Sequence, residues 1–299
     1  TSSYGDGYRM FMRTPPRMLP ALVTPFAGNG NLDLDAHASN LTALSDRGIT
    51  GFLLGGSTGE GPYLEDGERQ ALLETARATL GDSPFLLSGI MSESLRGALR
   101  QIEEAANGGA DAALVLTPTS LTRGRDEYVE SFFKDVAKAS ALPVLIYSVP
   151  LYTAYEPAIE TIARIAAFEN IVGMKDSGGN PARKAQIVEA TSDDFVLFAG
   201  SSKAIALSIA AGAYGSITAS GNYAPELIIE LIKKARRSAT SATEAQAQLT
   251  KLSLAVEEFG IPGVKVAAEA AGLTPGSPRK PLKKLPKASA TQVRKAMGV

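Results

Sequence analysis

A lysine occupies an unusual place in this sequence. Lys175 stands at the end of the apolar run NIVGMKD, residues 170–176, which has the character of a buried strand. A buried ammonium group is costly unless it is paired, and loss of hydration lowers the pKa of an amine. A free amine can attack a ketone and form a Schiff base. The alternative is a structural ion pair with Asp176, but successive strand residues face opposite sides, which places that carboxylate poorly.

A tyrosine ends the preceding apolar run, at the same edge of the expected sheet. Tyr147 lies in PVLIYSVP, residues 143–150, and could approach Lys175 from the neighbouring strand. Forming an imine requires protons to move at one atom, so a weak acid must lie within hydrogen-bond reach. A buried strand tyrosine by itself is more often structural. Beside Lys175, however, Tyr147 is predicted to carry protons, with Thr58 as its hydrogen-bond partner.

The segment GGSTG, residues 55–59, combines glycines with two hydroxyls. It fits the G-x-S-x-G pattern of a serine nucleophile, but the only histidine, His37, precedes it and falls in a predicted amphipathic helix, where we expect a half-buried packing role. A phosphate loop would need a Gly-Lys-Ser/Thr that does not follow. Backbone N–H groups with Ser57 and Thr58 suit a small carboxylate, and a plain tight turn is the structural alternative.

Eight near-continuously apolar runs indicate the elements that position these residues. The runs start at residues 19, 51, 84, 112, 143, 170, 195 and 214. They are typical of parallel strands covered on both faces, and each gap has room for one helix. Residues 32–48, 65–81 and 126–140 show helical periodicity with acidic starts. The pattern predicts an α/β protein with a (β/α)8 TIM barrel, and an open doubly wound sheet is the alternative.

After the eighth apolar run the pattern changes to consecutive helices. We expect an N-terminal arm at residues 1–18, the barrel at 19–224 and a C-terminal helical region at 225–299 that packs on the barrel or on a neighbouring subunit. The first 18 residues hold Arg9, Arg13 and Arg17 against one acidic residue, Asp6. This bias fits a disordered arm, a cloning remnant or a transit-like tail.

The composition excludes several classes of protein. The 299 residues carry a formal net charge of −1 without a long run of one sign, so we expect neither nucleic acid nor a membrane as partner. The absence of cysteine excludes disulfides and thiolate chemistry, and a single histidine excludes a metal site with three imidazoles. An all-oxygen site for magnesium or calcium stays open. The expected partner is a small molecule.

In a barrel of this kind the chemistry lies where the strands end, so the residues after each apolar run are the candidates for a site. They combine one amine, one phenol and many hydroxyls. They are residues 56–60, Tyr147 and Ser148, residues 175–177, residues 200–202 and residues 216–222.

With these residues assembled, the chain from about Leu19 to Pro286 resembles the dihydrodipicolinate synthase and N-acetylneuraminate lyase family of class I aldolases. GSTGE at 56, YSVP at 147 and GMKDS at 173 are similar to the family motifs G-[ST]-T-G-E, Y-N-x-P and G-x-K-[DE]-[AST]. The resemblance implies a pyruvate-dependent aldolase without metal or organic cofactor. It implies that Lys175 forms the imine with pyruvate and that Tyr147 carries protons.

The resemblance also assigns the remaining site residues. It implies that Ser57 and Thr58 hold the pyruvate carboxylate and that main-chain groups at Gly200 and Ile217 surround the substrate. It further implies a homotetramer built as a dimer of dimers, or a homodimer, with the C-terminal helices added to the barrel.

Departures from the family pattern narrow the expected function. Synthases of the family carry a tyrosine pair where this chain has Thr119 to Leu121, and they place an arginine for the semialdehyde carboxylate where Tyr152 stands. Both changes disfavour a role in lysine biosynthesis. YSVP, GMKDSGG and FGIPGVK at 259 instead resemble the 4-hydroxy-2-oxoglutarate aldolase branch.

The prediction is therefore a Schiff-base aldolase that cleaves or forms a 4-hydroxy-2-oxo acid or a 2-keto-3-deoxy sugar acid, with pyruvate and an aldehyde such as glyoxylate as the other side of the reaction. Hydroxyls at Ser177, Ser201 and Ser202 suit a polyol aldehyde as well as glyoxylate. The alternatives are a dihydrodipicolinate synthase, an imine-using dehydratase or hydratase-aldolase and, outside enzymes, a regulator that binds a keto acid. We expect a cytoplasmic location or an organellar matrix.

Overall fold

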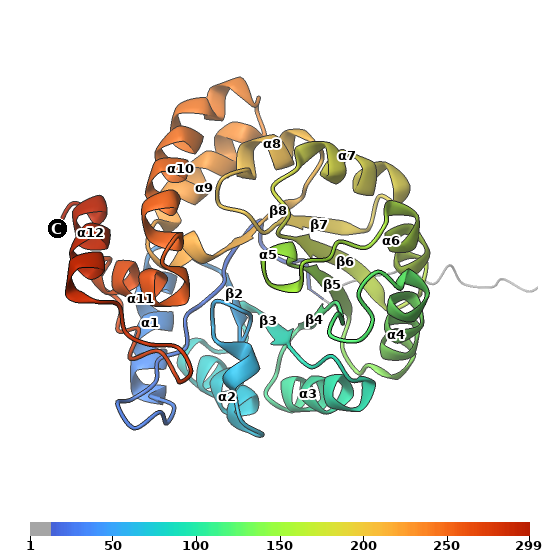
Figure 1. Cartoon of the computed structure of the whole chain (residues 1–299), viewed down its shortest axis with the longest axis horizontal. Coiled ribbons are helices and arrows are strands. Elements are labelled where there is room, and N and C mark those ends of the chain that lie inside the picture. The colour runs from blue at the N-terminus through green and yellow to red at the C-terminus, as the bar shows by residue number, and fades with distance from the viewer. Residues whose placement is uncertain (1–12) are drawn as a thin grey trace, which may run out of the picture.

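The computed structural model describes residues 13–299 and contains one eight-stranded parallel sheet curved into a barrel (Figure 1). The strands are β1 (Met18–Pro20), β2 (Gly51–Leu54), β3 (Phe85–Ile90), β4 (Ala112–Leu116), β5 (Val144–Ser148), β6 (Ile171–Asp176), β7 (Val196–Ala199) and β8 (Gly215–Thr218). β1 pairs with β8, and a bridge between Ala21 and Leu53 links the other edge of β1 to β2. The predicted barrel is confirmed, and the open sheet is wrong.

Helices alternate with the strands and cover the outside of the barrel (Figure 1). They are α1 (Leu34–Asp46), α2 (Glu68–Leu80), α3 (Leu95–Asn107), α4 (Asp126–Ala139), α5 (Pro150–Thr153), α6 (Ile159–Ala166), α7 (Pro181–Ala190), α8 (Ile205–Ala210) and α9 (Pro225–Ala235). Local sequence explains several starts, because the side chains of Asp33, Ser94 and Asn180 accept hydrogen bonds from the first turns of α1, α3 and α7.

Three further helices follow at the side of the barrel: α10 (Thr243–Glu257), α11 (Gly260–Ala270) and α12 (Lys287–Met297). α9 packs against α8 and β1, while α10, α11 and α12 pack on one another. The division of the chain at residues 18 and 224 stays a prediction. Most of the expected N-terminal arm, including Arg9, lies outside the described residues. Within residues 13–299, no helix has the length and apolar character needed to cross a membrane.

Strand alternation creates two apolar layers. One set of side chains fills the barrel interior, and the other packs between strands and helices. The interior set includes Leu53, Leu114, Leu145, Phe198 and Ile217. Because both faces of each strand are covered, the strands are apolar along their whole length. A polar side chain that points inward is therefore unusual, and the site is built from such residues.

Candidate active site

Lys175 points into the barrel. In the register of the sheet it lies between Tyr147 of β5 and Phe198 of β7. Its side chain is only 4% exposed, and its Nζ lies 3.4 Å from the Tyr147 hydroxyl and 4.5 Å from the centre of the Tyr147 ring. Burial lowers the pKa of Lys175 to about 7. A substantial fraction of this amine is therefore unprotonated near neutral pH.

Asp176 faces the opposite way, toward the helices. Its Oδ2 lies 3.1 Å from Nζ of Lys184 on α7, and both side chains are completely buried. Its Oδ1 accepts the N–H of Gly178 at 2.8 Å. Among residues 13–299 Lys175 makes no ion pair. The ion-pair alternative for Lys175 is therefore wrong, because strand alternation separates the two neighbours.

The Tyr147 hydroxyl joins Lys175 to two serines. It lies 3.1 Å from Ser57 Oγ and is also hydrogen-bonded to the Ser177 hydroxyl. Burial raises the pKa of Tyr147, and the hydrogen bonds from the two serines oppose this only in part. The phenol therefore keeps its proton at neutral pH and stands in a chain of groups that can exchange protons.

The predicted hydrogen bond between Thr58 and Tyr147 is wrong. Ser57 takes that place with a buried hydroxyl, whereas the next side chain, Thr58, is half-buried. The physical reason is the tight turn after β2, in which successive side chains diverge and only one can reach the barrel axis. Glu60 donates its N–H to the Ser57 carbonyl at 3.0 Å within this turn.

The loop at residues 55–61 is anchored to the C-terminal helices through Glu60. Glu60 is a non-glycine residue with φ of 57°, a conformation that costs about 1 kcal/mol and needs support. Its buried carboxylate lies 2.6 Å from Nζ of Lys265 on α11 and accepts the N–H of Arg279 at 2.7 Å. Lys265 also donates to the carbonyls of Thr24 and Ser277. Segments far apart in sequence therefore hold the loop that carries Ser57.

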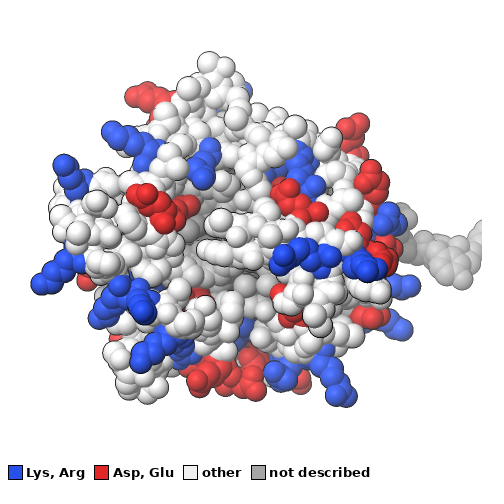
Figure 2. All heavy atoms as spheres, in the orientation of Figure 1, with Lys and Arg blue, Asp and Glu red and all other residues white. Residues whose placement is uncertain are grey.

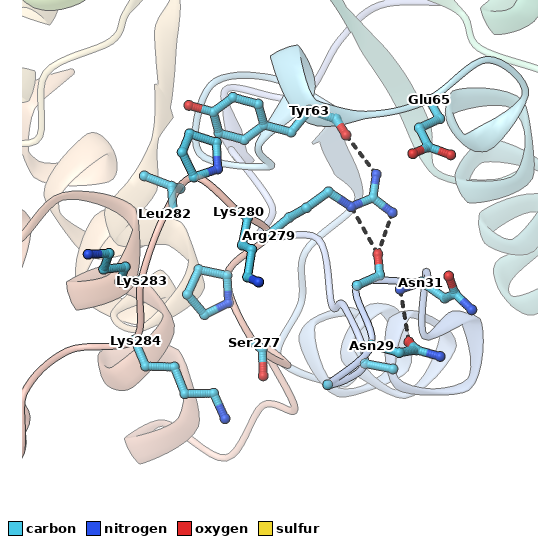
Figure 3. Close-up of a pocket in the computed structure, with 15 residues that line it drawn as sticks. Asn29, Asn31, Tyr63, Glu65, Ser277, Arg279, Lys280, Leu282, Lys283 and Lys284 are labelled. Atoms are coloured by element: carbon cyan, nitrogen blue, oxygen red, sulfur yellow. Dashed lines mark hydrogen bonds between the residues drawn. The ribbon is translucent and has the colours of Figure 1, made fainter.

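Arg279 extends this anchor on the outer side of the loop. Its guanidinium donates to the carbonyl of Tyr63, as Figure 3 shows, and to that of Gly30, and it also pairs with Glu68. The surrounding groove has a volume of about 1150 Å³ and includes Lys280, Lys283 and Lys284. Lys175 and Tyr147 do not line this groove, which adjoins the cavity above the strand ends through Tyr63 and Leu282.

The remaining predicted residues lie at the same end of the barrel. Gly200 donates its N–H to the Asp176 carbonyl at 2.8 Å, and a Cβ on Gly200 would come within 2.2 Å of Ser177 Oγ. Only glycine allows this close approach. Ser201 follows and is half-buried, and Ile217 is fully buried in the barrel interior.

The Ser202 hydroxyl, in contrast, is hydrogen-bonded to other protein groups. It lies 2.9 Å from Ser220 Oγ and donates to Glu257 of α10 at 2.7 Å. Tyr223 donates to the same carboxylate oxygen at 2.9 Å. Packing of α10 thus supplies an acceptor for this hydroxyl, and a contact of Ser202 with a substrate stays a prediction.

A cavity of about 330 Å³ lies above the strand ends, one hydrogen bond from Tyr147 through Ser57. Figure 2 shows this face hollowed near its middle. The cavity is lined by Ser57, Glu60, Pro62, Tyr63, Met91, Glu93, Leu116, Thr119, Val149, Tyr152, Thr153, Ile261 and Leu282. A small second molecule in this cavity would lie next to Ser57, whose hydroxyl contacts Tyr147.

Glu93 is the residue in this cavity that sequence reasoning missed. It follows β3 and accepts the N–H groups of Thr119 at 3.1 Å and Ser120 at 2.6 Å. Its position after the third apolar run is the one signal in the sequence that could have found it. Glu93 thereby holds the β4–α4 loop, where the expected family pattern has tyrosines.

His37 is fully buried rather than half-buried. Its Nε2 lies 3.2 Å from the carbonyl of Leu72, and burial lowers the pKa of His37 to about 4 although this contact opposes the shift. It contacts α2 on the outside of the barrel. His37 therefore packs against α2 and is not hydrogen-bonded to Ser57, which agrees with the exclusion of a serine–histidine nucleophile. Within residues 13–299, no three His, Asp or Glu side chains gather in a way that could hold a metal ion.

Comparison with known proteins agrees with this arrangement. The model of the "Dihydrodipicolinate synthetase family" matches residues 14–298. A 4-hydroxy-tetrahydrodipicolinate synthase 1 of Streptomyces coelicolor is 32% identical over 89% of this chain and 88% of its own length, and a 4-hydroxy-tetrahydrodipicolinate synthase of Xanthomonas campestris is 35% identical over 87% and 86%. A crystal structure of a dihydrodipicolinate synthase from Bacillus anthracis superposes with a TM-score of 0.89 at 27% identity, covering 95% of this chain and 99% of that one.

The chain therefore belongs to the dihydrodipicolinate synthetase family. It is an enzyme, a carbon–carbon lyase of the pyruvate-dependent aldolase class. The named relatives are 4-hydroxy-tetrahydrodipicolinate synthases and not 4-hydroxy-2-oxoglutarate aldolases. The family prediction is confirmed, and the predicted branch within it stays a prediction.

The lowered pKa of Lys175 should make the stability of the enzyme depend on pH. The amine titrates near 10.5 in an unfolded chain and near 7 in the folded one. Between these values the unfolded chain binds one more proton, so the free energy of unfolding should rise with pH, by up to about 1.4 kcal/mol per unit. Urea denaturation at pH 7, 8 and 9 should show this rise in the wild type. Lys175→Met should lack it, and equal slopes in both proteins would contradict the assignment.

Proposed function

We propose that this enzyme is a Schiff-base aldolase in which Lys175 forms an imine with pyruvate and Tyr147 transfers protons. The observation that carries the proposal is a buried amine with a pKa of about 7 whose Nζ lies 3.4 Å from a buried phenol at the barrel mouth. A neutral amine is the nucleophile that a ketone requires, and a phenol that keeps its proton is a suitable acid.

The reaction follows from these two groups. Nζ of Lys175 attacks the ketone carbon of pyruvate, one water leaves and a protonated imine forms. A methyl proton is then removed, and the enamine carbon attacks the aldehyde carbon while the aldehyde oxygen takes up a proton. One water hydrolyses the imine, which releases a 4-hydroxy-2-oxo acid and the free amine. Tyr147, linked to Ser57 and Ser177, moves the protons, and cleavage is the same sequence in reverse.

The loop after β2 is proposed to hold the pyruvate carboxylate. Ser57 and Thr58 stand on a tight turn whose backbone N–H groups suit an anion. Main-chain groups at Gly200 and Ile217, with the hydroxyls of Ser177 and Ser201, would complete the substrate surroundings. The anchoring of Glu60 by Lys265 supports this role, because a binding loop must keep its geometry.

The substrate is proposed to be a 4-hydroxy-2-oxo acid or a 2-keto-3-deoxy sugar acid. Tyr152 lines the cavity above the strand ends, called the mouth cavity below. It stands where synthases of the family place an arginine. Synthesis of 4-hydroxy-tetrahydrodipicolinate is the second candidate, since the relatives at 32–35% identity carry that name. An imine-using dehydratase or hydratase-aldolase, a cytoplasmic location and assembly as a homotetramer or homodimer stay predictions. The non-catalytic keto-acid regulator is set aside, because the chain belongs to a family of lyases.

The test is intact-protein mass spectrometry after borohydride treatment with and without pyruvate. The wild type should gain about 72 Da only with pyruvate, the mass of a reduced imine by atom count. Peptide mapping should place the adduct on Lys175. If the folded wild type shows no adduct, the proposed mechanism is wrong. Product analysis with pyruvate and a panel of aldehydes then separates aldol products from dehydration products and from binding without turnover.

A further inference from the structure

The mouth cavity beside Tyr147 has a wall that suits one kind of aldehyde. Six of its residues are apolar: Pro62, Met91, Leu116, Val149, Ile261 and Leu282. The polar members are hydroxyl groups and two carboxylates, Glu60 and Glu93. We propose that the aldehyde partner is a small uncharged hydroxyaldehyde, and that Glu93 excludes aldehydes that carry a carboxylate. This inference rests on the proposed function and selects among its substrates.

The two carboxylates differ in how their charges are balanced. Both oxygens of Glu60 have partners, one at Lys265 Nζ and the other at the Arg279 N–H. Glu93 makes no ion pair within residues 13–299 and is held only by neutral donors of the β4–α4 loop. Burial opposes ionisation of Glu93, but hydrogen bonds from Ser120 and Thr119 outweigh it and lower the pKa. Glu93 therefore presents a negative charge without an ion-pair partner to the cavity at neutral pH.

The charge has opposite effects on the two classes of aldehyde. A carboxylate on the aldehyde would approach Glu93 in a partly desolvated cavity, where like charges repel more strongly than in water. A hydroxyl group can instead donate a hydrogen bond to the same carboxylate. Tyr152 and Thr119 also line this cavity, and Thr119 donates its N–H to Glu93. The wall thus discriminates by charge.

The volume limits the size of the aldehyde. A cavity of about 330 Å³ lies at the lower end of the range for small-molecule sites, roughly 300–1,000 Å³. An aldehyde in this cavity would meet the apolar side chains of Met91, Leu116 and Val149 and could direct its hydroxyl groups to Glu93 and Tyr152. Two- or three-carbon hydroxyaldehydes match this combination.

The experiment compares aldehydes that differ mainly in charge. Aldol formation from pyruvate is measured with glycolaldehyde and D-glyceraldehyde, and with glyoxylate and succinic semialdehyde. We expect kcat/KM of the wild type to be at least about tenfold higher for glycolaldehyde than for glyoxylate. In Glu93→Gln the ratio of kcat/KM for glycolaldehyde to kcat/KM for glyoxylate should fall at least about fivefold, mainly because kcat/KM for glyoxylate rises.

Two further variants make the test specific. Asp66→Asn is the control, because Asp66 is an exposed acid just before α2 that pairs with Arg100 of α3 and does not line the cavity. The ratio of this variant should equal that of the wild type. Tyr152→Arg places a cation on the wall and should raise kcat/KM for glyoxylate even if Glu93→Gln does not fold.

Each result decides the inference. A wild-type preference for glyoxylate, a ratio unchanged in Glu93→Gln, or no gain for glyoxylate in Tyr152→Arg overturns it. A wild type that forms the pyruvate adduct but accepts no hydroxyaldehyde overturns it as well. Failure of the proposed function is distinguishable from these results, because it would appear as the absence of the pyruvate adduct.

Discussion

Replacing Lys175 by methionine is expected to abolish the pyruvate adduct and to lower kcat/KM by about 10⁴-fold or more, the scale seen when an enzyme loses its nucleophile. Methionine has similar length and no charge, so it should fit the barrel interior where Lys175 is almost fully enclosed. It also removes a buried amine whose ionisation is disfavoured in the folded state. The variant should therefore fold at least as well as the wild type near pH 7.

The measurement combines borohydride trapping, steady-state rates and thermal unfolding on the same samples. Two other buried lysines provide an internal comparison, because Lys184 and Lys265 are held by Asp176 and Glu60 and should remain unmodified in the wild type. Lys280, which lines the groove around Arg279, is a suitable control, and Lys280→Met should keep the adduct. An adduct that persists in folded Lys175→Met would show that a different amine reacts.

Tyr147→Phe is expected to lower kcat by about 10²–10⁴-fold, the usual contribution of a general acid–base group. The pyruvate adduct should still form, though more slowly, because Lys175 keeps its position. The substitution removes only the hydroxyl that contacts Ser57, Ser177 and Lys175. The ring should continue to pack in the barrel interior, so loss of stability should not account for the loss of rate.

The matched control is Tyr223→Phe. Tyr223 is also buried, and its hydroxyl donates to Glu257 and makes no contact with Lys175. Both variants remove one buried hydroxyl, so their effects on the melting temperature should be comparable, while only Tyr147→Phe should change kcat and the pH–rate profile. A profile and kcat almost unchanged in Tyr147→Phe would exclude Tyr147 as the proton carrier.

The sequence alone determined the barrel and the residues nearest the chemistry. Strands buried on both faces must be apolar throughout, so eight such runs with helical gaps predict a closed parallel barrel. The same rule made Lys175 conspicuous, since a polar residue within such a run needs a reason. Alternation along a strand separates Lys175 from Asp176, and neighbouring strands bring Tyr147 beside it. These local rules were sufficient to predict the barrel and to bring Lys175 and Tyr147 together.

The tertiary structure determined the direction of side chains in the loops, which local sequence rules do not predict. Ser57 rather than Thr58 contacts Tyr147, because the turn after β2 is supported by Lys265 and Arg279 from more than 200 residues away. Ser202 donates its hydroxyl to Glu257, because packing of α10 brings this carboxylate to it. Glu93 enters the mouth cavity through contacts with the β4–α4 loop. Side-chain direction in loops depends on long-range partners, and no periodicity in the sequence encodes those partners.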